Sequence, residues 1–289
     1  MDRVVVITGP TSGGKSALAL DMALKDNGVI INADALQLYK DLPILTACPN
    51  EHEKEMVPHR LYEILDHTEQ CTAGIWANLA AKEIETVLHN GQKPYVVGGS
   101  GFYLMALIQG LSEMPDADPE MRVKLKDDLQ IYGLDYMYKQ LEWYDPIVAA
   151  KLHPHDQQRI MRGLEVYQTT LKPLSYWQSL PKKTFPYTFD VTVLCPEREK
   201  LYQNCNTRFL KMVDMGAIDE VNNLMQQNIA ETASVTQALG YKELKLYIEG
   251  GLMLGEAIEL AQIKTRQFAK RQTTWCRHQF TNAHWIEPM

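Results

Sequence analysis

The residues with the clearest chemical meaning stand near the N-terminus, where a β-branched run leads into Gly9, Pro10, Thr11, Ser12, Gly13, Gly14, Lys15 and Ser16. The spacing G-x-x-x-x-G-K-S is that of a P-loop, and it stands in the strand–loop–helix context that the motif requires. Glycines let such a loop wind around phosphate oxygens, and the N-terminus of the following helix faces the same point. We therefore predict that this segment binds a diphosphate or polyphosphate, with Lys15 on the outer phosphate and the Ser16 hydroxyl on Mg²⁺.

Two further segments could take part in chemistry, and each follows an apolar stretch. They are Asp34 and the turn Gly98-Gly99-Ser100-Gly101. In a parallel sheet, ligands sit outside the carboxyl ends of the strands, so Asp34 is expected beside the phosphates. Its carboxylate could contact Mg²⁺ or act as a general base, or it could simply cap a helix or stabilise a loop. The glycine turn could be only a tight turn, or it could bring the backbone close to a substrate with Ser100 supplying a hydroxyl.

The elements that must position these residues have an α/β pattern. Apolar strands alternate with helical stretches near 16–25 and 75–89, which predicts an α/β fold with a P-loop NTPase-like, doubly wound parallel sheet flanked by helices. Residues 112–187 instead show a helical periodicity and are bounded by proline-containing segments. This pattern indicates a helical insertion domain, and residues 1–111 and 188–289 would form the core. The last part is expected to be helical to about Arg277. The expected strands are Val4–Thr8, Gly28–Ala33, Tyr95–Val97 and Phe189–Cys195.

The amino-acid composition limits the kinds of protein to which this chain can belong. Hydrophobic residues make up 45% of the 289 residues and charged residues 22%, which are ordinary globular values. The five cysteines are odd in number and form no C-x-x-C, so we expect free thiols rather than disulfides or a zinc site. With no signal peptide and no apolar run long enough for a membrane span, we expect a cytoplasmic protein without a membrane partner. The net charge of -7 requires any contact with nucleic acid to be local.

A basic helix face near the C-terminus is a candidate for such a contact. At helical spacing, one side is expected to be apolar (Leu254, Ile258, Ala261, Phe268 and Trp275), while Arg266, Lys270 and Arg277 lie opposite. No acidic residue occurs between Lys264 and His278. On an acidic protein this face could contact a phosphate backbone, although a solvated basic face is the ordinary alternative. Arg159 and Arg162 form a second basic cluster within the insertion.

The expected strand ends lack a Walker-B aspartate: the third ends in glycines and the fourth in Leu194-Cys195-Pro196. A P-loop ATPase normally uses such an aspartate to help hold Mg²⁺. A motor or switch NTPase is therefore disfavoured, while a small-molecule kinase is weakened and stays open.

Taken together, several segments resemble those of the tRNA dimethylallyltransferases, also called isopentenyl-diphosphate:tRNA transferases. They occur in the family's order over nearly the whole chain, and the absence of a C-terminal zinc-finger extension resembles the bacterial type. The chain departs from common family residues at Ala35, Pro43, Leu45, Cys48 and Leu171, none of which is a proposed catalytic group. The matching segments are residues 9–16, 31–39, 97–104, 116–122, 158–167, 237–243 and 265–275.

This resemblance implies transfer of a dimethylallyl group from dimethylallyl diphosphate to the exocyclic amine of the adenosine beside the anticodon, with release of diphosphate. It makes Asp34 the general base and gives catalytic roles to Lys15, Ser100 and Arg208, with Mg²⁺ as cofactor. The P-loop and Arg266 would hold the donor, although Arg208 and Arg266 could each contact diphosphate or RNA. The expected tRNA contacts, to the anticodon loop, are Asp34, Ala35, Leu36, Gln37, Ser100, Arg122, Gln158, Arg159, Ile160, Met161, Arg162 and Lys270.

Three alternatives remain beside this interpretation. An adenylate isopentenyltransferase would use a free nucleotide and would need neither the insertion nor the basic helix. A small-molecule kinase is supported by the P-loop alone. An RNA-binding module without catalysis would leave Lys15, Ser16 and Asp34 without a role. For the oligomeric state, a monomer is favoured.

Overall fold

The computed structural model describes residues 2–114, 118–227 and 229–287, so Asp116 and Ala117 of the 116–122 motif lie outside the described residues. The chain divides into two compact units, one of residues 1–108 and 185–289 and the other of residues 109–184. These boundaries lie three residues from the predicted divisions at 111/112 and 187/188. Within the described residues, no helix is both long and apolar enough to cross a membrane.

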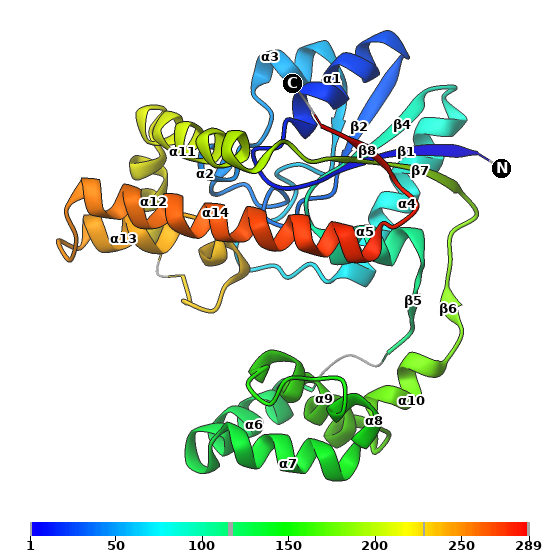
Figure 1. Ribbon diagram of the computed structural model, residues 1–289, viewed down its shortest axis with the longest axis vertical. Helices are drawn as coiled ribbons and strands as arrows, with labels where there is room; N and C mark the ends of the chain where they lie inside the picture. The colour runs from blue at the N-terminus through cyan, green and yellow to red at the C-terminus, as the bar shows by residue number, and fades with distance from the viewer. Residues whose placement is uncertain (1, 115–117, 228, 288–289) are drawn as a thin grey trace. The chain divides into compact units, whose positions relative to one another are not determined.

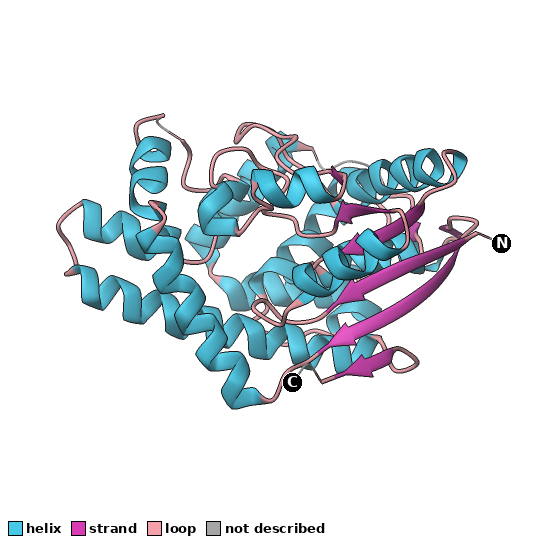
Figure 2. Ribbon diagram, turned by 90° about the horizontal axis from the view of Figure 1, so that it is seen from above, coloured by secondary structure: helices cyan, strands magenta, loops and turns pink. Residues whose placement is uncertain are grey.

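The first unit, which we call the core unit, is built on a six-stranded sheet with the order β3-β2-β4-β1-β7-β8 (Figures 1 and 2). Every neighbouring pair in this sheet is parallel. The predicted α/β fold with a P-loop NTPase-like parallel sheet is confirmed. The strands are β1 (Arg3–Thr8), β2 (Gly28–Asn32), β3 (His59–Arg60), β4 (Lys93–Val97), β7 (Thr188–Leu194) and β8 (His284–Ile286).

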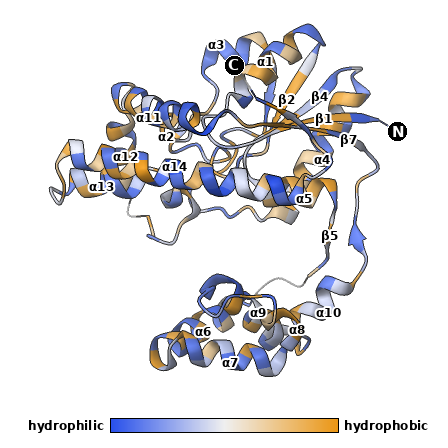
Figure 3. Cartoon of the chain, in the orientation of Figure 1, coloured by the Kyte–Doolittle hydropathy of each residue, from blue (hydrophilic) through white to orange (hydrophobic). Residues whose placement is uncertain are grey.

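The central strands are apolar because both faces of the sheet are covered by helices. Val4–Ile7 of β1 and Val29–Ile31 of β2 are buried, and Figure 3 shows hydrophobic stretches in this part of the sheet. Side chains alternate along each strand, so Val5 and Ile7 of β1 pack with Ala19 and Ala23 of one helix, α1 (Lys15–Lys25). The alternate residues face the other way, and α4 (Ala73–His89) packs on β2 and β4. This arrangement holds the strand ends rigidly, which suits a site at the carboxyl edge of the sheet.

Other helices of the core unit cover the sheet and its carboxyl edge. The longest, α14, packs against α5, α11 and α13 (Figure 1). Its bounds and those of the remaining helices are α2 (Pro43–Thr46), α3 (Glu51–Met56), α5 (Gly101–Ile108), α11 (Arg198–Asp214), α12 (Ala217–Met225), α13 (Tyr241–Ile248) and α14 (Leu254–Gln279), with a 3-10 turn at Ser234–Gln237.

The C-terminal part is helical as far as was expected, since α14 ends at Gln279, close to Arg277. The strand β8, about which the sequence raised no expectation, follows this helix and pairs with β7. The apolar side predicted for α14 is half-buried except for Ala261. Because α14 packs closely on several helices, its buried face carries mostly small or polar side chains. These are Ala257, Ala261, Thr265, Ala269, Gln272 and Cys276.

The second unit, the insertion unit, is helical and has its own apolar core. Leu125, Met137, Leu141, Ile160 and Leu164 are each almost completely buried there. A short antiparallel ladder of β5 (Leu111–Ser112) and β6 (Lys182–Lys183) joins its first and last segments. The helices are α6 (Pro119–Tyr132), α7 (Leu134–Tyr144), α8 (Pro146–Ala149), α9 (Gln157–Thr170) and α10 (Leu174–Ser179).

The turn after β4 generates a prediction about stability. A Cβ on Gly98 would lie 2.1 to 2.7 Å from backbone atoms of Ala33, whereas nothing lies within 4 Å of one on Gly255 of α14. Gly98→Ala should therefore lower the free energy of unfolding by about 2 kcal/mol or more. Gly255→Ala should raise it by about 0.5–1 kcal/mol through helix propensity. Thermal unfolding of the two variants checks both signs, and an unchanged Gly98→Ala protein would contradict the close approach.

Candidate active site

The P-loop between β1 and α1 adopts a conformation that requires its glycines. Gly9 and Gly14 have φ angles of 138° and 90°, and Ser12 is also left-handed at 59°. A Cβ on Gly9 would lie 2.0 Å from the carbonyl oxygen of Leu194, at the end of the neighbouring strand β7. Within the loop, the Gly13 N–H donates to the Pro10 carbonyl at 3.1 Å. The loop is thus pressed against β7 and curls toward the start of α1, as phosphate binding requires.

Lys15 occupies the centre of this loop. Its Nζ donates to the Pro10 carbonyl at 2.8 Å, so the side chain folds back over the loop. Burial lowers the pKa of Lys15 from 10.5 to about 8; the Asp34 carboxylate opposes that shift and the Arg208 guanidinium adds to it. Lys15 and Arg208 are thus two half-buried cationic groups that face the same cavity, an arrangement that favours an anionic ligand between them.

Of the two arginines matched to the family, Arg208 lies at the P-loop. Its guanidinium, from α11, donates to the Thr11 hydroxyl, and burial lowers its pKa. Arg266 of α14 instead donates to Asn206 Oδ1 at 2.6 Å and is not among the residues that line the P-loop cavity. A direct diphosphate contact stays a prediction for both arginines, and of the two only Arg208 lines the P-loop cavity.

The P-loop lines a cavity of about 450 Å³ whose walls are of two kinds. The P-loop backbone, Lys15 and Arg208 form the polar wall. Leu20, Ile30, Tyr62 and Val97 contribute apolar surface. Cys48, one of the departures from common family residues, also lines the cavity, and burial raises the pKa of its thiol to about 12, so it is neutral. The cavity suits a ligand that has both phosphates and a short apolar group.

Asp34 follows β2 in a turn that the side chain of Asn32 stabilises. Asn32 is fully buried; its Oδ1 accepts from the Asp34 N–H at 2.7 Å, and its Nδ2 donates to the Asp34 carbonyl at 3.0 Å. The Asp34 carboxylate accepts only from the Leu36 N–H among the bonds within the described residues, at 3.1 Å. One carboxylate oxygen is thus left without a partner there, and the side chain is half-buried rather than enclosed. This geometry fits a group that can accept a proton.

Ser100 supports the same turn. Its hydroxyl oxygen accepts from the Ala35 N–H at 2.9 Å, and its own N–H donates to the Ala33 carbonyl at 3.1 Å. The contacts of Ser100 therefore orient the residue next to Asp34 while its hydroxyl proton remains available. Gln37 has a similar role, since its amide donates to the carbonyls of Thr46 and Ala47 at 3.0 and 2.7 Å. Asp34–Gln37 form one half-buried segment, and their contact with tRNA stays a prediction.

Gln272 is a site residue that sequence reasoning missed. Its side chain, from the buried face of α14, accepts from the Thr11 N–H at 2.7 Å and donates to the Gly99 carbonyl at 2.9 Å. It thereby connects the P-loop to the turn that follows β4. A glutamine inside an otherwise basic helix has no distinctive spacing, although it lies within the 265–275 segment that resembles the family.

In the insertion unit, two arginines predicted to contact tRNA share one buried carboxylate. Arg122 Nε lies 2.7 Å from Glu165 Oε1, and Arg162 Nη1 lies 3.0 Å from Glu165 Oε2. The Glu165 side chain is only 7% exposed, whereas those of Arg122 and Arg162 are 50% and 35% exposed. The buried Glu165 thus holds both guanidinium groups near the surface, and part of each arginine side chain remains exposed, where a ligand could contact it.

The other tRNA candidates of α9 divide by exposure. Gln158 and Arg159 are exposed, and Arg159 pairs with Asp156 at 3.3 Å. The prediction for Ile160 was wrong: its side chain is fully buried in the apolar core of the insertion unit, where helical spacing turns it inward. Met161 is half-buried against that core.

The fold and the site together define a P-loop enzyme with a phosphate cradle beside a carboxylate. A sequence model of the family described as "IPP transferase" matches residues 37–279. The tRNA dimethylallyltransferase of Zymomonas mobilis is 42% identical over 288 residues, which cover 98% of this chain and 90% of that protein. That of Rhodospirillum centenum is 41% identical, covering 99% and 91%. The chain therefore belongs to the tRNA dimethylallyltransferase, or IPP transferase, family.

Solved structures agree with this assignment. The full-length tRNA isopentenylpyrophosphate transferase of Bacillus halodurans superposes with a TM-score of 0.72 and 33% identity, covering 99% of this chain and 90% of that one. A eukaryotic dimethylallyltransferase described as acting on tRNA gives a TM-score of 0.82 and 30% identity, covering 99% and 74%. The family that the sequence resembles is thus confirmed.

The Gln272 bridge generates the second prediction. Gln272→Leu removes both hydrogen bonds and should lower the free energy of unfolding by about 1–3 kcal/mol, because Thr11 N–H and Gly99 C=O lose their partner. It should also weaken binding of a diphosphate ligand, since the loop is no longer held. Gln267→Leu, at an exposed position of the same helix, is the matched control. Thermal unfolding and ligand affinity distinguish the two; equal behaviour would show that the bridge contributes nothing.

The third prediction concerns Glu165. Glu165→Gln adds net positive charge, which by electrostatics alone would strengthen tRNA binding. We expect the opposite result, weaker binding, because Arg122 and Arg162 lose the carboxylate that orients them. Hydrogen exchange should also become faster in residues 109–184. Glu142→Gln, at an exposed position of α7, makes the same charge change without touching either arginine and should not weaken binding. Tighter tRNA binding by Glu165→Gln would refute the orienting role.

Proposed function

We propose that this chain transfers the dimethylallyl group of dimethylallyl diphosphate to the exocyclic amine of the adenosine beside the anticodon of tRNA, releasing diphosphate. The observation that carries the proposal is the cavity in which a cationic P-loop meets an apolar wall. Asp34 does not line this cavity itself, but its carboxylate is close enough to raise the pKa of Lys15 there. Membership of the family supports the same reaction. In this reading the P-loop holds a leaving group, and no nucleotide is hydrolysed.

In the proposed reaction, the allylic carbon–oxygen bond of the donor breaks and negative charge grows on the departing diphosphate. Lys15, Arg208 and the backbone of the P-loop line the same cavity and would stabilise this charge. Their contribution would be electrostatic preorganisation, because the fold orients them before the bond breaks. The apolar wall of the same cavity would hold the five-carbon group and limit the access of water to it.

Asp34 is the proposed general base. The exocyclic amine of adenine is a weak nucleophile because its lone pair is delocalised into the ring. As the new carbon–nitrogen bond forms, the nitrogen must lose a proton, and the Asp34 carboxylate would accept it. The Asn32 and Ser100 contacts hold the turn so that the carboxylate oxygen without a partner can face the amine.

Magnesium is proposed as the cofactor. Among the described residues there is no group of three or more His, Cys, Asp or Glu that could hold a metal ion alone. The Ser16 hydroxyl, exposed in the P-loop cavity, fits a different kind of site. Mg²⁺ commonly keeps several waters and binds through few protein oxygens together with substrate phosphates. Ser16 would hold the ion against the diphosphate, where the ion would neutralise leaving-group charge.

The tRNA would be held by cations of both units, including the exposed Lys270 of α14 and Arg159 of α9 and the half-buried Arg162 of α9. Because an adenosine in a stacked loop cannot reach a carboxylate in a cavity, the target base must leave its stack. The insertion unit is proposed to hold the anticodon loop in that state. A tRNA substrate agrees with the cytoplasmic location expected from the sequence.

The test is incubation with dimethylallyl diphosphate, Mg²⁺ and unmodified tRNA, followed by digestion and mass spectrometry of the nucleosides. Prenylated adenosine and one diphosphate per transfer are expected, with no ADP formed from ATP. Transfer to free AMP without tRNA would favour an adenylate isopentenyltransferase. Formation of ADP that depends on a small acceptor would favour a kinase.

The fourth prediction tests the base. Asp34→Asn keeps an oxygen that can accept from the Leu36 N–H but cannot take a proton, so the turn is preserved while the base is lost. Single-turnover prenylation should fall by about 10²–10⁴, with little change in donor affinity. Asp34→Glu should recover part of the rate. A near-normal rate for Asp34→Asn would remove Asp34 from the role of base.

The fifth prediction follows from the pKa of Lys15, which is lowered to about 8. Below that pH the amine is charged and attracts diphosphate, and above it the charge is lost. Donor affinity should therefore weaken as the pH rises from 7 to 9.5, approaching a tenfold loss per pH unit at the upper end. Lys15→Arg keeps its charge throughout, so its affinity should be independent of pH over this range. Calorimetric titration of both proteins checks the contrast, and a flat wild-type profile would contradict it.

A further inference from the structure

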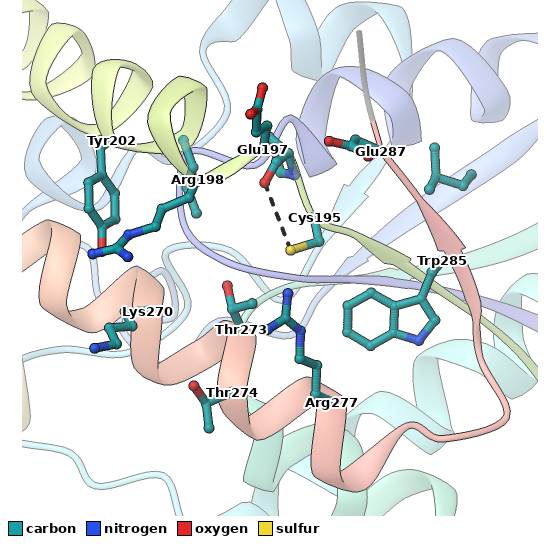
Figure 4. A pocket seen from close by; sticks show the side chains of 13 residues that line it. Cys195, Glu197, Arg198, Tyr202, Lys270, Thr273, Thr274, Arg277, Trp285 and Glu287 are labelled. Atoms are coloured by element: carbon teal, nitrogen blue, oxygen red, sulfur yellow. Dashed lines mark hydrogen bonds between the residues drawn. The ribbon is translucent and has the colours of Figure 1, made fainter.

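A second cavity, of about 610 Å³, lies beyond the carboxyl ends of β7 and β8 in the core unit, and we call it the β7–β8 pocket (Figure 4). Its walls come from the segment after β7, the start of α11, the second half of α14, and β8 with the residue after it. Among the residues that the structure describes, none lines both this pocket and the P-loop cavity. The end of β7 stands between the two: Leu194 packs against the P-loop glycines, while the next residue, Cys195, lines the pocket. Apart from Lys270, already proposed as a tRNA contact, the proposed reaction gives no role to the residues that line this space.

Three cationic side chains line the β7–β8 pocket: Arg198, Lys270 and Arg277. All three are exposed, and within the part of the chain that the structure describes none of them forms an ion pair with a carboxylate. Glu197 and Glu287 also line the pocket, but Figure 4 shows the Glu197 carboxylate turned away from Lys270 and Arg277. The wall formed by α14 is therefore positive and lacks a bound counter-charge of its own, which suits a phosphate group.

Aromatic rings accompany these cations. Trp285 of β8 lines the pocket with 37% of its surface exposed, and Figure 4 shows its indole beside the Arg277 side chain. On the opposite wall the Arg198 guanidinium lies 5.2 Å from the centre of the Tyr202 ring. Exposed aromatic faces next to cations are the pattern with which proteins bind unpaired nucleotides, where bases stack and phosphates meet lysine or arginine.

The positive surface also continues beyond one pocket. A neighbouring hollow of about 650 Å³ on α14 is lined by Lys270, Arg271 and His278. Lys270 and Thr274 each line both this hollow and the β7–β8 pocket. Cations in two adjoining hollows match the repeated phosphates of a chain better than the single group of a small ligand. A polymer, rather than a free nucleotide, is the ligand that these observations favour.

We propose that the β7–β8 pocket binds a nucleotide of the substrate tRNA other than the target adenosine. Lys270 and Arg277 would contact its phosphate, and Trp285 would stack on its base. This inference rests on the proposed function for the identity of the RNA. Because α14 also carries Gln272, which bridges the P-loop and Gly99, RNA in this pocket would hold the helix that shapes the donor site.

Two variants separate the charge from the stacking contribution, with an unmodified tRNA transcript as the probe. Arg277→Ala should weaken tRNA binding and reduce the slope of log Kd against log salt by about one. Trp285→Leu should weaken binding by about 5- to 100-fold without changing that slope. Trp285→Phe keeps a ring and should lose less. Thermal unfolding confirms that each variant is folded, and affinity for dimethylallyl diphosphate should be unaffected in all three.

Lys82→Ala, an exposed charge loss on α4, is the matched control and should leave Kd and the salt slope unchanged. If folded Arg277→Ala and Trp285→Leu bind tRNA like this control, the proposal is wrong. If instead AMP or ATP binds with a dependence on Arg277 and Trp285 while tRNA binding is intact, the pocket is a free-nucleotide site and the proposal is again wrong. Failure of the proposed function is seen separately, as wild-type protein that forms no prenylated adenosine.

Discussion

The close approach of backbone segments at the carboxyl edge of the sheet is the constraint on which the site depends. The P-loop at Gly9 lies against the Leu194 carbonyl, and the turn at Gly98 lies against Ala33, in each case without room for a Cβ. Gln272 then joins the P-loop to the second of these turns. Phosphate cradle, glycine turn and Asp34 are thus parts of one packed surface, so that moving one of them disturbs the others.

This packing has an electrostatic cost that a diphosphate would relieve. Lys15 and Arg208 are both desolvated at the P-loop, each has its pKa lowered by burial, and Arg208 lowers the pKa of Lys15 further. Asp34 is the nearby carboxylate that offsets part of this repulsion. An anion bound between the two cations would restore favourable charge interactions, so the cradle is complementary in sign to the negative charge that develops on a leaving diphosphate.

The protein has a net charge of -7, yet its proposed substrate is a polyanion. Despite the negative net charge, cations are concentrated on two local surfaces of the structure. On α14 they form an acid-free surface, whereas in the insertion unit Arg122 and Arg162 are anchored to the buried Glu165. The first kind of surface attracts phosphates over several ångströms, and the second orients guanidinium groups in a defined geometry. An RNA that binds both surfaces would be attracted by the charge of the first and oriented by the guanidinium groups of the second.

Much of the fold and part of the site could be predicted from the sequence by itself. The P-loop was recognisable because its spacing is a local property of the backbone, and the central strands because both faces of the sheet demand β-branched, apolar residues. The same applies to Asp34, which follows directly after such a strand. Segments matched in family order identified the family, since their agreement over the whole chain does not depend on knowing any contact.

Only the tertiary structure decided which distant residues meet. Thr11 and Gln272 are 261 residues apart, and nothing in the spacing of either indicates the hydrogen bond between them. Helical spacing on α14 suggested an apolar side, but close packing of several helices selected small and polar residues for the buried face instead. Ile160 is in the core and not on an RNA surface because α9 turns that side toward its neighbours. Local sequence determines conformation over a few residues, whereas contacts between elements depend on how their faces fit together.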